Sequence, residues 1–409
     1  MSDDEGRETP GEPTPGEDAP GVAEKLALYQ RAGGVLTALM TALIAFLIGG
    51  LVVLASGSNP FSTYGAVFNG TGLNWLFPWV TGAARTTAGL NLQQTLLLTT
   101  PLILCGLAVA FAFRCGMFNI GGEGQYLVGS IMAVWIGSSF LKMNGPLHIV
   151  LTIVVAALAG GLYAGIAGFL KATVGAHEVI TTIMLNWIAV WVGSWLFGLG
   201  GPLQSHANGA AVPVSNDIAQ GAHLHVFWGD PVLQGLHVGF FVALAALVVY
   251  WLTLNRTTLG YQVRAVGFNP EAARYGGIGV ARNYFRAMAI AGLFAGVAGA
   301  VDVLGWEFRL NVNDIQISNI GFIAIAVALL GRNTAVGVFF SALLFGALLN
   351  GTSTRNLDPT VFRPDLAGNL TLIIQGLVVL FVGADVLVLW VWNQRRRLRP
   401  RRAGAVGSS

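Results

Sequence analysis

Residues 255–286 read NRTTLGYQVRAVGFNPEAARYGGIGVARNYFR and lie between two long apolar segments. The stretch holds five arginines and a single acid, Glu271, whereas no other Lys or Arg occurs between residues 172 and 308. In a membrane protein, basic loops of this kind remain on the cytoplasmic side during insertion. The stretch therefore predicts a cytoplasmic loop, and it orients the apolar segments on either side.

A short helix is predicted inside this loop. Asn269 is a favourable N-cap residue, Pro270 suits the first helical position, and Glu271 places an acid in the first turn. Gly276 and Gly277 should end the helix about two turns later. A short capped helix on the cytoplasmic face is typical of a docking element.

The composition indicates a membrane protein. Of the 409 residues, 54% are hydrophobic and only 10% are charged, whereas a soluble domain carries about 25% charged residues. Apolar runs near spanning length occur at residues 33–55, 95–113, 124–141, 147–170, 180–199, 236–254, 285–305, 319–331, 335–350 and 369–392. The runs at 319–331 and 335–350 are two short spans or one broken pair; counted as two, they give ten. The sequence therefore predicts an all-α integral membrane protein of about ten transmembrane helices.

The distribution of basic residues predicts that both termini are cytoplasmic. With ten spans in that orientation, 17 Lys and Arg residues lie inside and 5 lie outside, as the positive-inside rule requires. Residues 1–24 are acidic and lack the apolar content to fold, so they are expected to form a disordered cytoplasmic tail. Residues 25–393 then form the transmembrane domain, with long outside loops at 56–94 and 200–235. The basic tail, 394–409, is explained by contact with anionic lipid and requires no nucleic acid.

No catalytic residue, metal site or bound cofactor is predicted. None of the three lysines closes a phosphate-binding loop, and the chain has no H-E-x-x-H, C-x-x-C or nucleophile-elbow motif. Cys105 and Cys115 would lie about 15 Å apart along a helix, too far for a disulfide, and are interpreted as packing residues. If the protein uses ATP, another polypeptide must hydrolyse it.

A second polar feature interrupts the apolar pattern at residues 117–125, MFNIGGEGQ. Its glycines should break a helix, and Asn119, Glu123 and Gln125 place polar groups at or near membrane depth. Irregular backbone is tolerated there only against protein or a water-filled cavity, and an intramembrane carboxylate is a functional candidate. For Glu123, support of the broken backbone, lining of a pathway, and proton or ion coupling all remain open.

Trp187, Trp191 and Trp195 recur every four residues, so they form one stripe on a helix. This stripe is either a stacking surface for a flat ligand in a pathway or a packing surface against a neighbouring helix.

Several phrases resemble one family of transport proteins. Glu271, Ala272 and Ala273, followed after three residues by Gly277, are similar to the E-A-A-x-x-x-G core of ATP-binding-cassette (ABC) importer permeases. The I-x-L-P ending of the maltose-type branch is absent. Four longer phrases resemble the ribose, nucleoside and branched-chain amino-acid permeases, specifically their simple-sugar and nucleoside branch: RAVGFNPEAA at 264–273, FNIGGEGQ at 118–125, HEVITTIMLN at 177–186 and ALLGRN at 328–333. The resemblance extends from about residue 95 to 392.

This resemblance implies a permease subunit, not itself an enzyme, that forms the pathway for a nucleoside or related sugar across a bacterial plasma membrane. ATP and Mg would bind a cytoplasmic partner ATPase with two nucleotide sites. The implied partners also include a second, non-identical permease and an extracytoplasmic binding protein. The implied ATPase-coupling residues are Arg264, Asn269, Pro270, Glu271, Ala272, Ala273 and Gly277. The alternative is an ion-coupled secondary transporter that uses Glu123 and Asp385 as coupling groups.

Overall fold

A computed structural model describes residues 42–55, 57–140, 142–206, 212–230 and 235–353, together with 369, 372, 373, 376, 377 and 380. The two predicted tails, 1–24 and 394–409, lie outside these residues. So do Asp385 and most of the expected last span, 369–392. The disordered acidic tail, the basic tail, the last span and the role of Asp385 therefore remain predictions.

The described chain is almost entirely helical. Its helices are an apolar segment Ala42–Ala55, α2 Pro60–Thr71, α3 Gly82–Arg114, α4 Gly122–Ser139, α5 Gly145–Val174, α6 Glu178–Phe197, α7 Gly239–Arg256, α8 Thr258–Phe268, α9 Pro270–Tyr275, α10 Val280–Asp302, α11 Val312–Ile317, α12 Ile320–Leu330 and α13 Ala335–Gly351. Short 3₁₀ turns form η1 Leu73–Leu76 and η3 Gln220–Ala222, and a π-helical turn, η5 Val303–Glu307, continues α10. One antiparallel pair, β1 Val226–Trp228 and β2 Leu236–His237, is the only sheet among these residues.

Six stretches of the described chain are long and apolar enough to cross a membrane, namely α3, α5, α6, α7, α10 with η5, and Val312–Leu330. Two shorter apolar helices, Ala42–Ala55 and α13, accompany them. The predicted class, an all-α membrane protein, is confirmed. The count of ten spans and the side of each terminus stay predictions.

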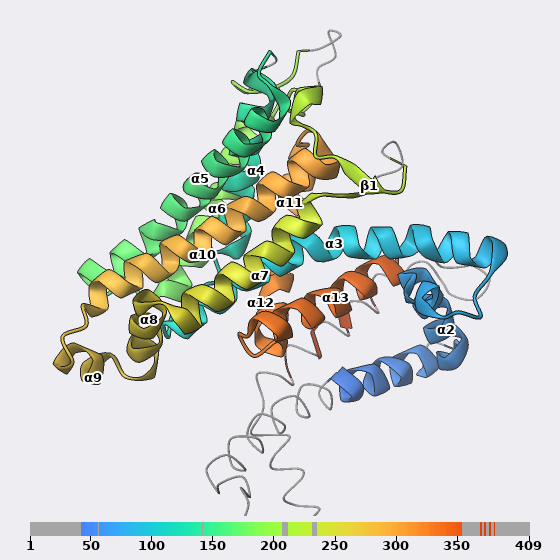
Figure 1. Ribbon diagram of the computed structural model, residues 1–409, viewed down its shortest axis with the longest axis horizontal. Coiled ribbons are helices and arrows are strands. Elements are labelled where there is room, and N and C mark those ends of the chain that lie inside the picture. The colour runs from blue at the N-terminus through green and yellow to red at the C-terminus, as the bar shows by residue number, and fades with distance from the viewer. Residues whose placement is uncertain are drawn as a thin grey trace, which may run out of the picture.

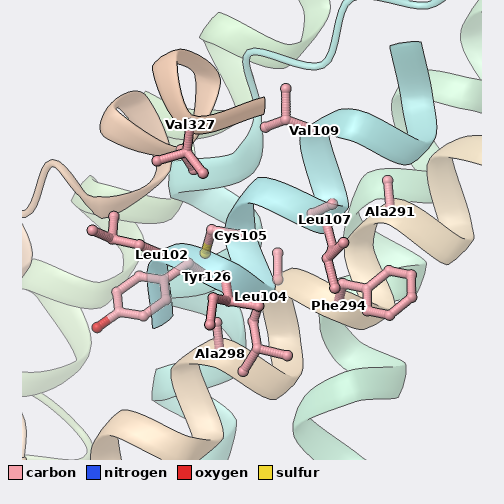
Figure 2. Close-up of a cluster of buried hydrophobic side chains, with 14 of the residues drawn as sticks. Leu102, Leu104, Cys105, Leu107, Val109, Tyr126, Ala291, Phe294, Ala298 and Val327 are labelled. Carbon is pink, nitrogen blue, oxygen red and sulfur yellow. The ribbon is translucent and has the colours of Figure 1, made fainter. Parts of the chain in front are cut away.

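The core is built around α3 and α10. In the most apolar part of each of these two helices about four-fifths of the residues are buried, whereas in α5, α6 and α7 a third or fewer are buried. Figure 2 shows Leu102, Leu104 and Cys105 of α3 beside Phe294 and Ala298 of α10, and all of these side chains are buried. In lipid, close packing of this kind replaces the hydrophobic drive between helices. Both cysteines are free and buried, as the packing interpretation requires.

The polar ends of the bundle lie far apart. In Figure 1, α5, α7 and α10 run alongside one another; α8 and α9 lie at one end and β1 lies toward the other. The predicted loop 255–286 therefore forms one end of the molecule, and it contains α8 as well as the expected short helix α9.

The prediction of a long outside loop at residues 56–94 was wrong. Residues 56–94 are not a simple loop, because they contain α2, η1 and the first thirteen residues of α3. Residues 82–94 are too polar to continue an apolar run, yet they form a helix that buries Ala88, Leu92 and Gln93. This part of α3 was missed because only one side of the helix is buried and the segment as a whole is polar.

The ambiguous pair at 319–350 forms two separate helices. At eleven residues, α12 is about 16 Å long, half the thickness of a bilayer core of about 30 Å. Residues 331–334 turn the chain directly into α13, with Arg332 and Asn333 at φ of 51° and 52°. The first residues of α12 thus lie inside the bundle.

Candidate functional site

The short helix α9 begins and ends where its sequence predicts. The Asn269 side chain accepts hydrogen bonds from the backbone N–H groups of Glu271 and Ala272, both at 3.0 Å, and Pro270 occupies the first turn. The helix ends at Tyr275. Of the expected coupling residues, Glu271 and Ala272 are exposed and Ala273 is buried against the protein. Gly277, at φ 79°, turns the chain toward α10. Arg264 lies on α8, where its Nε donates to the Gly260 carbonyl at 3.3 Å.

Two aromatic side chains flank α9 and project into solvent. Phe268 is 90% exposed and Tyr275 is 94% exposed. Aromatic residues are the usual anchors of protein interfaces. The motif-based prediction missed both residues, although an aromatic on each side of a capped helix in a polar loop is a usable signal.

The α8–α9 unit touches the link between α3 and α4. A Cβ atom on Gly267 would overlap the carbonyl oxygen of Arg114, the last residue of α3. On the other side of the contact, a Cβ on Gly116 would lie 3.3 Å from the Gly267 Cα. Backbone therefore meets backbone here, between the end of α8 and the link from α3 to α4.

The same end of α3 is tied to α7 and α13. The Nε and Nη2 of Arg114 donate to the Asn333 carbonyl at 3.0 and 2.8 Å, and the Tyr250 hydroxyl donates to the same oxygen at 2.7 Å. This carbonyl follows the left-handed turn at residues 331–334, so three helices converge at one acceptor.

A polar network stabilises the break before α4. Asn119 and Gln125 pair through two side-chain amide hydrogen bonds of 2.9 and 3.0 Å. Asn186 of α6 accepts from the Gly124 N–H at 2.8 Å and donates to the Ile120 carbonyl at 2.9 Å. All of these side chains are buried, and the backbone groups freed by the break are thereby satisfied.

Glu123 joins two helix N-termini. It lies in the first turn of α4 and is 2% exposed, and its Oε2 accepts from the backbone N–H of Gly321 in the first turn of α12 at 2.7 Å. A carboxylate between two helix starts is favoured by both helix dipoles and by the unpaired N–H groups there. In this conformation Glu123 supports the break; pathway lining by Asn119, Glu123 and Gln125 stays a prediction.

Beyond this contact lies a cavity of about 880 Å³. It is formed by Leu98 of α3, by α4, η5, α11 and the start of α12, and by five residues that precede β1, namely Ser205, Val212, Val214, Ser215 and Asp217. Its polar lining includes Tyr126, Ser130, Trp306, Glu307, Arg309, Asn311, Asp314 and Ser318. This volume accommodates a drug-sized or nucleoside-sized solute. Asn119, Glu123 and Gln125 are not among the lining residues.

Asp302 orients two of the lining side chains. Its carboxylate, 1% exposed, accepts from the Tyr126 hydroxyl at 2.8 Å and from the Trp306 indole N–H at 3.3 Å. Two rings with fixed orientations therefore form part of the cavity wall. Periodicity did not single out Tyr126, because the bond that orients it joins residues 176 positions apart, whereas Trp306 bonds a residue only four positions before it.

The tryptophan stripe of α6 lies elsewhere. Trp187 and Trp191 are 57% and 63% exposed, on the outer face of the bundle, and neither lines the cavity. Their place in a pathway stays a prediction. Among the described residues there is no cluster of His, Cys, Asp and Glu that could hold a metal ion.

A helical membrane bundle with a cavity of about 880 Å³, a broken helix beside it and an exposed capped helix at one end has the features of a membrane transport permease. Residues 91–383 match the family described as the branched-chain amino acid transport system permease component. The chain belongs to this family.

Its relatives include named nucleoside and sugar permeases. The guanosine ABC transporter permease protein NupP of Bacillus subtilis is 36% identical, with 90% of this chain and 99% of NupP aligned. The nucleoside ABC transporter permease protein NupB of Lactococcus lactis is 31% identical over 87% of this chain and 92% of NupB. The glucose ABC transporter permease protein TsgB13 of Haloferax volcanii is 32% identical over 85% of this chain and 86% of TsgB13. No solved structure matches the chain.

Proposed function

We propose that this chain forms the membrane pathway of an ATP-driven importer for a nucleoside or a related sugar. The observation that carries the proposal is the exposed helix α9, which bears the E-A-A-x-x-x-G residues and connects through continuous contacts to the cavity. The names of the relatives support the class of solute. Because the chain has no phosphate-binding loop, a partner ATPase with two nucleotide sites must bind and hydrolyse Mg-ATP.

The docking surface for this ATPase is α9 with Phe268 and Tyr275. Ala272 keeps the exposed face of the helix slender enough to enter a groove, Ala273 lets the helix pack closely on its own chain, and Glu271 offers an exposed charge at the rim. The two aromatic rings then act as anchors on either side. This end faces the cytoplasm because the basic residues of 255–286 remain on that side during insertion.

Movement of the docked helix reaches the cavity through the backbone. The α9 helix displaces α8, Gly267 pushes on the Arg114 carbonyl, and residues 115–121 carry the shift to the start of α4. Glu123 couples that start to Gly321 of α12, and Ser318 and Ile320 beside it line the cavity. A hinge of this kind suits alternating access around a central site.

The cavity walls suit an uncharged, hydrogen-bonding solute. Tyr126 and Trp306 provide ring surfaces, and Asn311 and Ser318 provide donors and acceptors. Three acids, Asp217, Glu307 and Asp314, line the cavity with one base, Arg309, which pairs with Asp217 at 3.8 Å. The excess of acids disfavours anions such as nucleotides and sugar phosphates. A binding protein outside and a second permease, non-identical in this branch, complete the transporter.

Energy dependence tests this function. Proteoliposomes containing the assembled transporter should take up labelled nucleoside when Mg-ATP is present on the ATPase side, with ion gradients collapsed by ionophores. Uptake that persists with ATP depleted and an ion gradient maintained would contradict the proposal and favour the ion-coupled alternative.

A further inference from the structure

A second cleft, separate from the cavity, lies among η1, the start of α3 and β1. It has a volume of about 320 Å³ and is lined by Trp75, Arg85, Thr86, Leu90, Gln93 and Trp228, with Gly82 and Gly89. None of these residues lines the larger cavity. Since β1 and α9 lie toward opposite ends of the molecule (Figure 1), the cleft is remote from the docking surface.

Two indole rings form the walls of this cleft. The centroids of Trp75 and Trp228 are 5.4 Å apart, and their planes meet at 56°. Sandwiching a flat ring between parallel indoles needs roughly 7 Å, twice a van der Waals contact, so a ligand would stack on one ring and abut the other. The Arg85 guanidinium lines the cleft 5.1 Å from the Trp75 centroid, and its Nη1 donates to the Val80 carbonyl at 3.4 Å.

Gln93 supplies an amide on the wall of the cleft. Its side chain is only 6% exposed and lines the cleft. Gly229, at φ 103°, has no Cβ and so leaves room for the Gln93 Oε1 beside its backbone. A glutamine amide on a cleft wall can pair with one acceptor and one donor of a ligand that enters the cleft.

We propose that this cleft binds the base of a nucleoside before the solute enters the cavity; the inference rests on the proposed function. Indole faces stack on any nucleobase. A glutamine amide offers a paired donor and acceptor that match a base edge, and a guanidinium donates to base carbonyl and ring-nitrogen acceptors. No carboxylate lines the cleft, so nothing there selects a cation.

The cleft and the cavity share one helix. Gln93 and Leu98 of α3 line the cleft and the cavity respectively, and five residues along a helix span about 7.5 Å. The cleft and the cavity therefore lie at neighbouring levels along α3. The cleft acts as a receiving site on the side that faces the binding protein.

The test is ligand binding to the purified full-length chain in lipid nanodiscs, measured by saturation-transfer NMR with guanosine and with free ribose. Guanosine should bind through its base protons, at least tenfold more tightly than ribose. The Trp228→Ala and Gln93→Leu variants should each weaken guanosine binding about tenfold. Trp79→Ala is the matched control, because Trp79 is 75% exposed, stacks on Phe77 and does not line the cleft.

Equal binding of ribose and guanosine, no guanosine binding to the wild-type chain, or unchanged binding in both cleft variants would overturn the inference. A Trp306→Ala variant separates the two sites: it alters the cavity and should leave cleft binding intact. Failure of the inference is distinguishable from failure of the proposed function. ATP-driven uptake without nucleoside binding in the cleft would refute only the cleft as a binding site. Nucleoside binding in the cleft without ATP-driven uptake would refute the proposed importer function.

Discussion

The role of Glu123 can be measured by two substitutions of different severity. Glu123→Gln keeps an oxygen that can accept from the Gly321 N–H but removes the negative charge. Glu123→Ala removes the acceptor, leaves that N–H buried without a partner and opens a small cavity between α4 and α12.

The structure sets the expected order of stability. A hydrogen bond to a charged acceptor contributes about 1.5–3 kcal/mol and a neutral one about 0.5–1.5, so the glutamine variant should lose about 1–2 kcal/mol of unfolding free energy. The alanine variant adds an unsatisfied buried N–H and lost packing, for a loss of about 3–5 kcal/mol. Glu271→Ala is the matched control, because Glu271 also lies in a first helical turn but is exposed. This variant should lose no more than about 0.5 kcal/mol of unfolding free energy.

The assay is reversible unfolding of the purified chain in mixed detergent, followed by tryptophan fluorescence. Unfolding free energies for both Glu123 variants within about 0.5 kcal/mol of wild type, together with lost uptake, would refute the supporting role. That result would instead assign Glu123 to the pathway or to ion coupling.

Four further outcomes are expected. Glu271→Arg should weaken copurification of the ATPase at least roughly thirtyfold without changing the folded yield; normal copurification would contradict docking at α9. Tyr275→Ala should weaken the same association; an unchanged affinity for the ATPase would show that Tyr275 is not part of the docking surface. Gly267→Val should retain the ATPase but uncouple hydrolysis from uptake, because its side chain would overlap the Arg114 carbonyl; normal uptake per ATP would rule out this contact as the link. Burial lowers the pKa of His237 from 6.5 to about 4, and its Nδ1 accepts from the Gly239 N–H. The unfolded chain therefore takes up the proton first as pH falls, and roughly 2–4 kcal/mol of stability should be lost between pH 6.5 and 4, but not in His237→Asn; equal pH profiles would refute this.

Local signals in the sequence predicted the coupling helix well. The cap at Asn269 and the glycines after Tyr275 act within a few residues, so α9 begins and ends as expected. Apolar runs likewise located α5, α6 and α7. The start of α3 was missed because residues 82–94 are polar on one side and bury the other, a pattern that a search for continuous apolar runs cannot detect.

The cavity could not be predicted from local pattern. Tyr126 is oriented by its bond to Asp302, 176 positions away, and Asn186 completes the break near Ile120 from 66 positions away. Such pairings depend on tertiary structure. The MFNIGGEGQ phrase did mark the break correctly, but the sequence could not indicate that Glu123 bonds the start of α12.

The central claim is that movement at the ATPase-docking end reaches the cavity. The two native cysteines are buried, so an Asp314→Cys variant provides an exposed thiol on the cavity wall, and Asn216→Cys provides an exposed control outside it. In the assembled transporter, adding Mg-ATP should change the rate of thiol labelling at position 314 several-fold and leave position 216 unchanged. The change should disappear when Gly267→Val is combined with Asp314→Cys. The account would be contradicted if Mg-ATP left the labelling rate at position 314 unchanged. It would also be contradicted if Mg-ATP changed that rate equally in the variant that carries Gly267→Val.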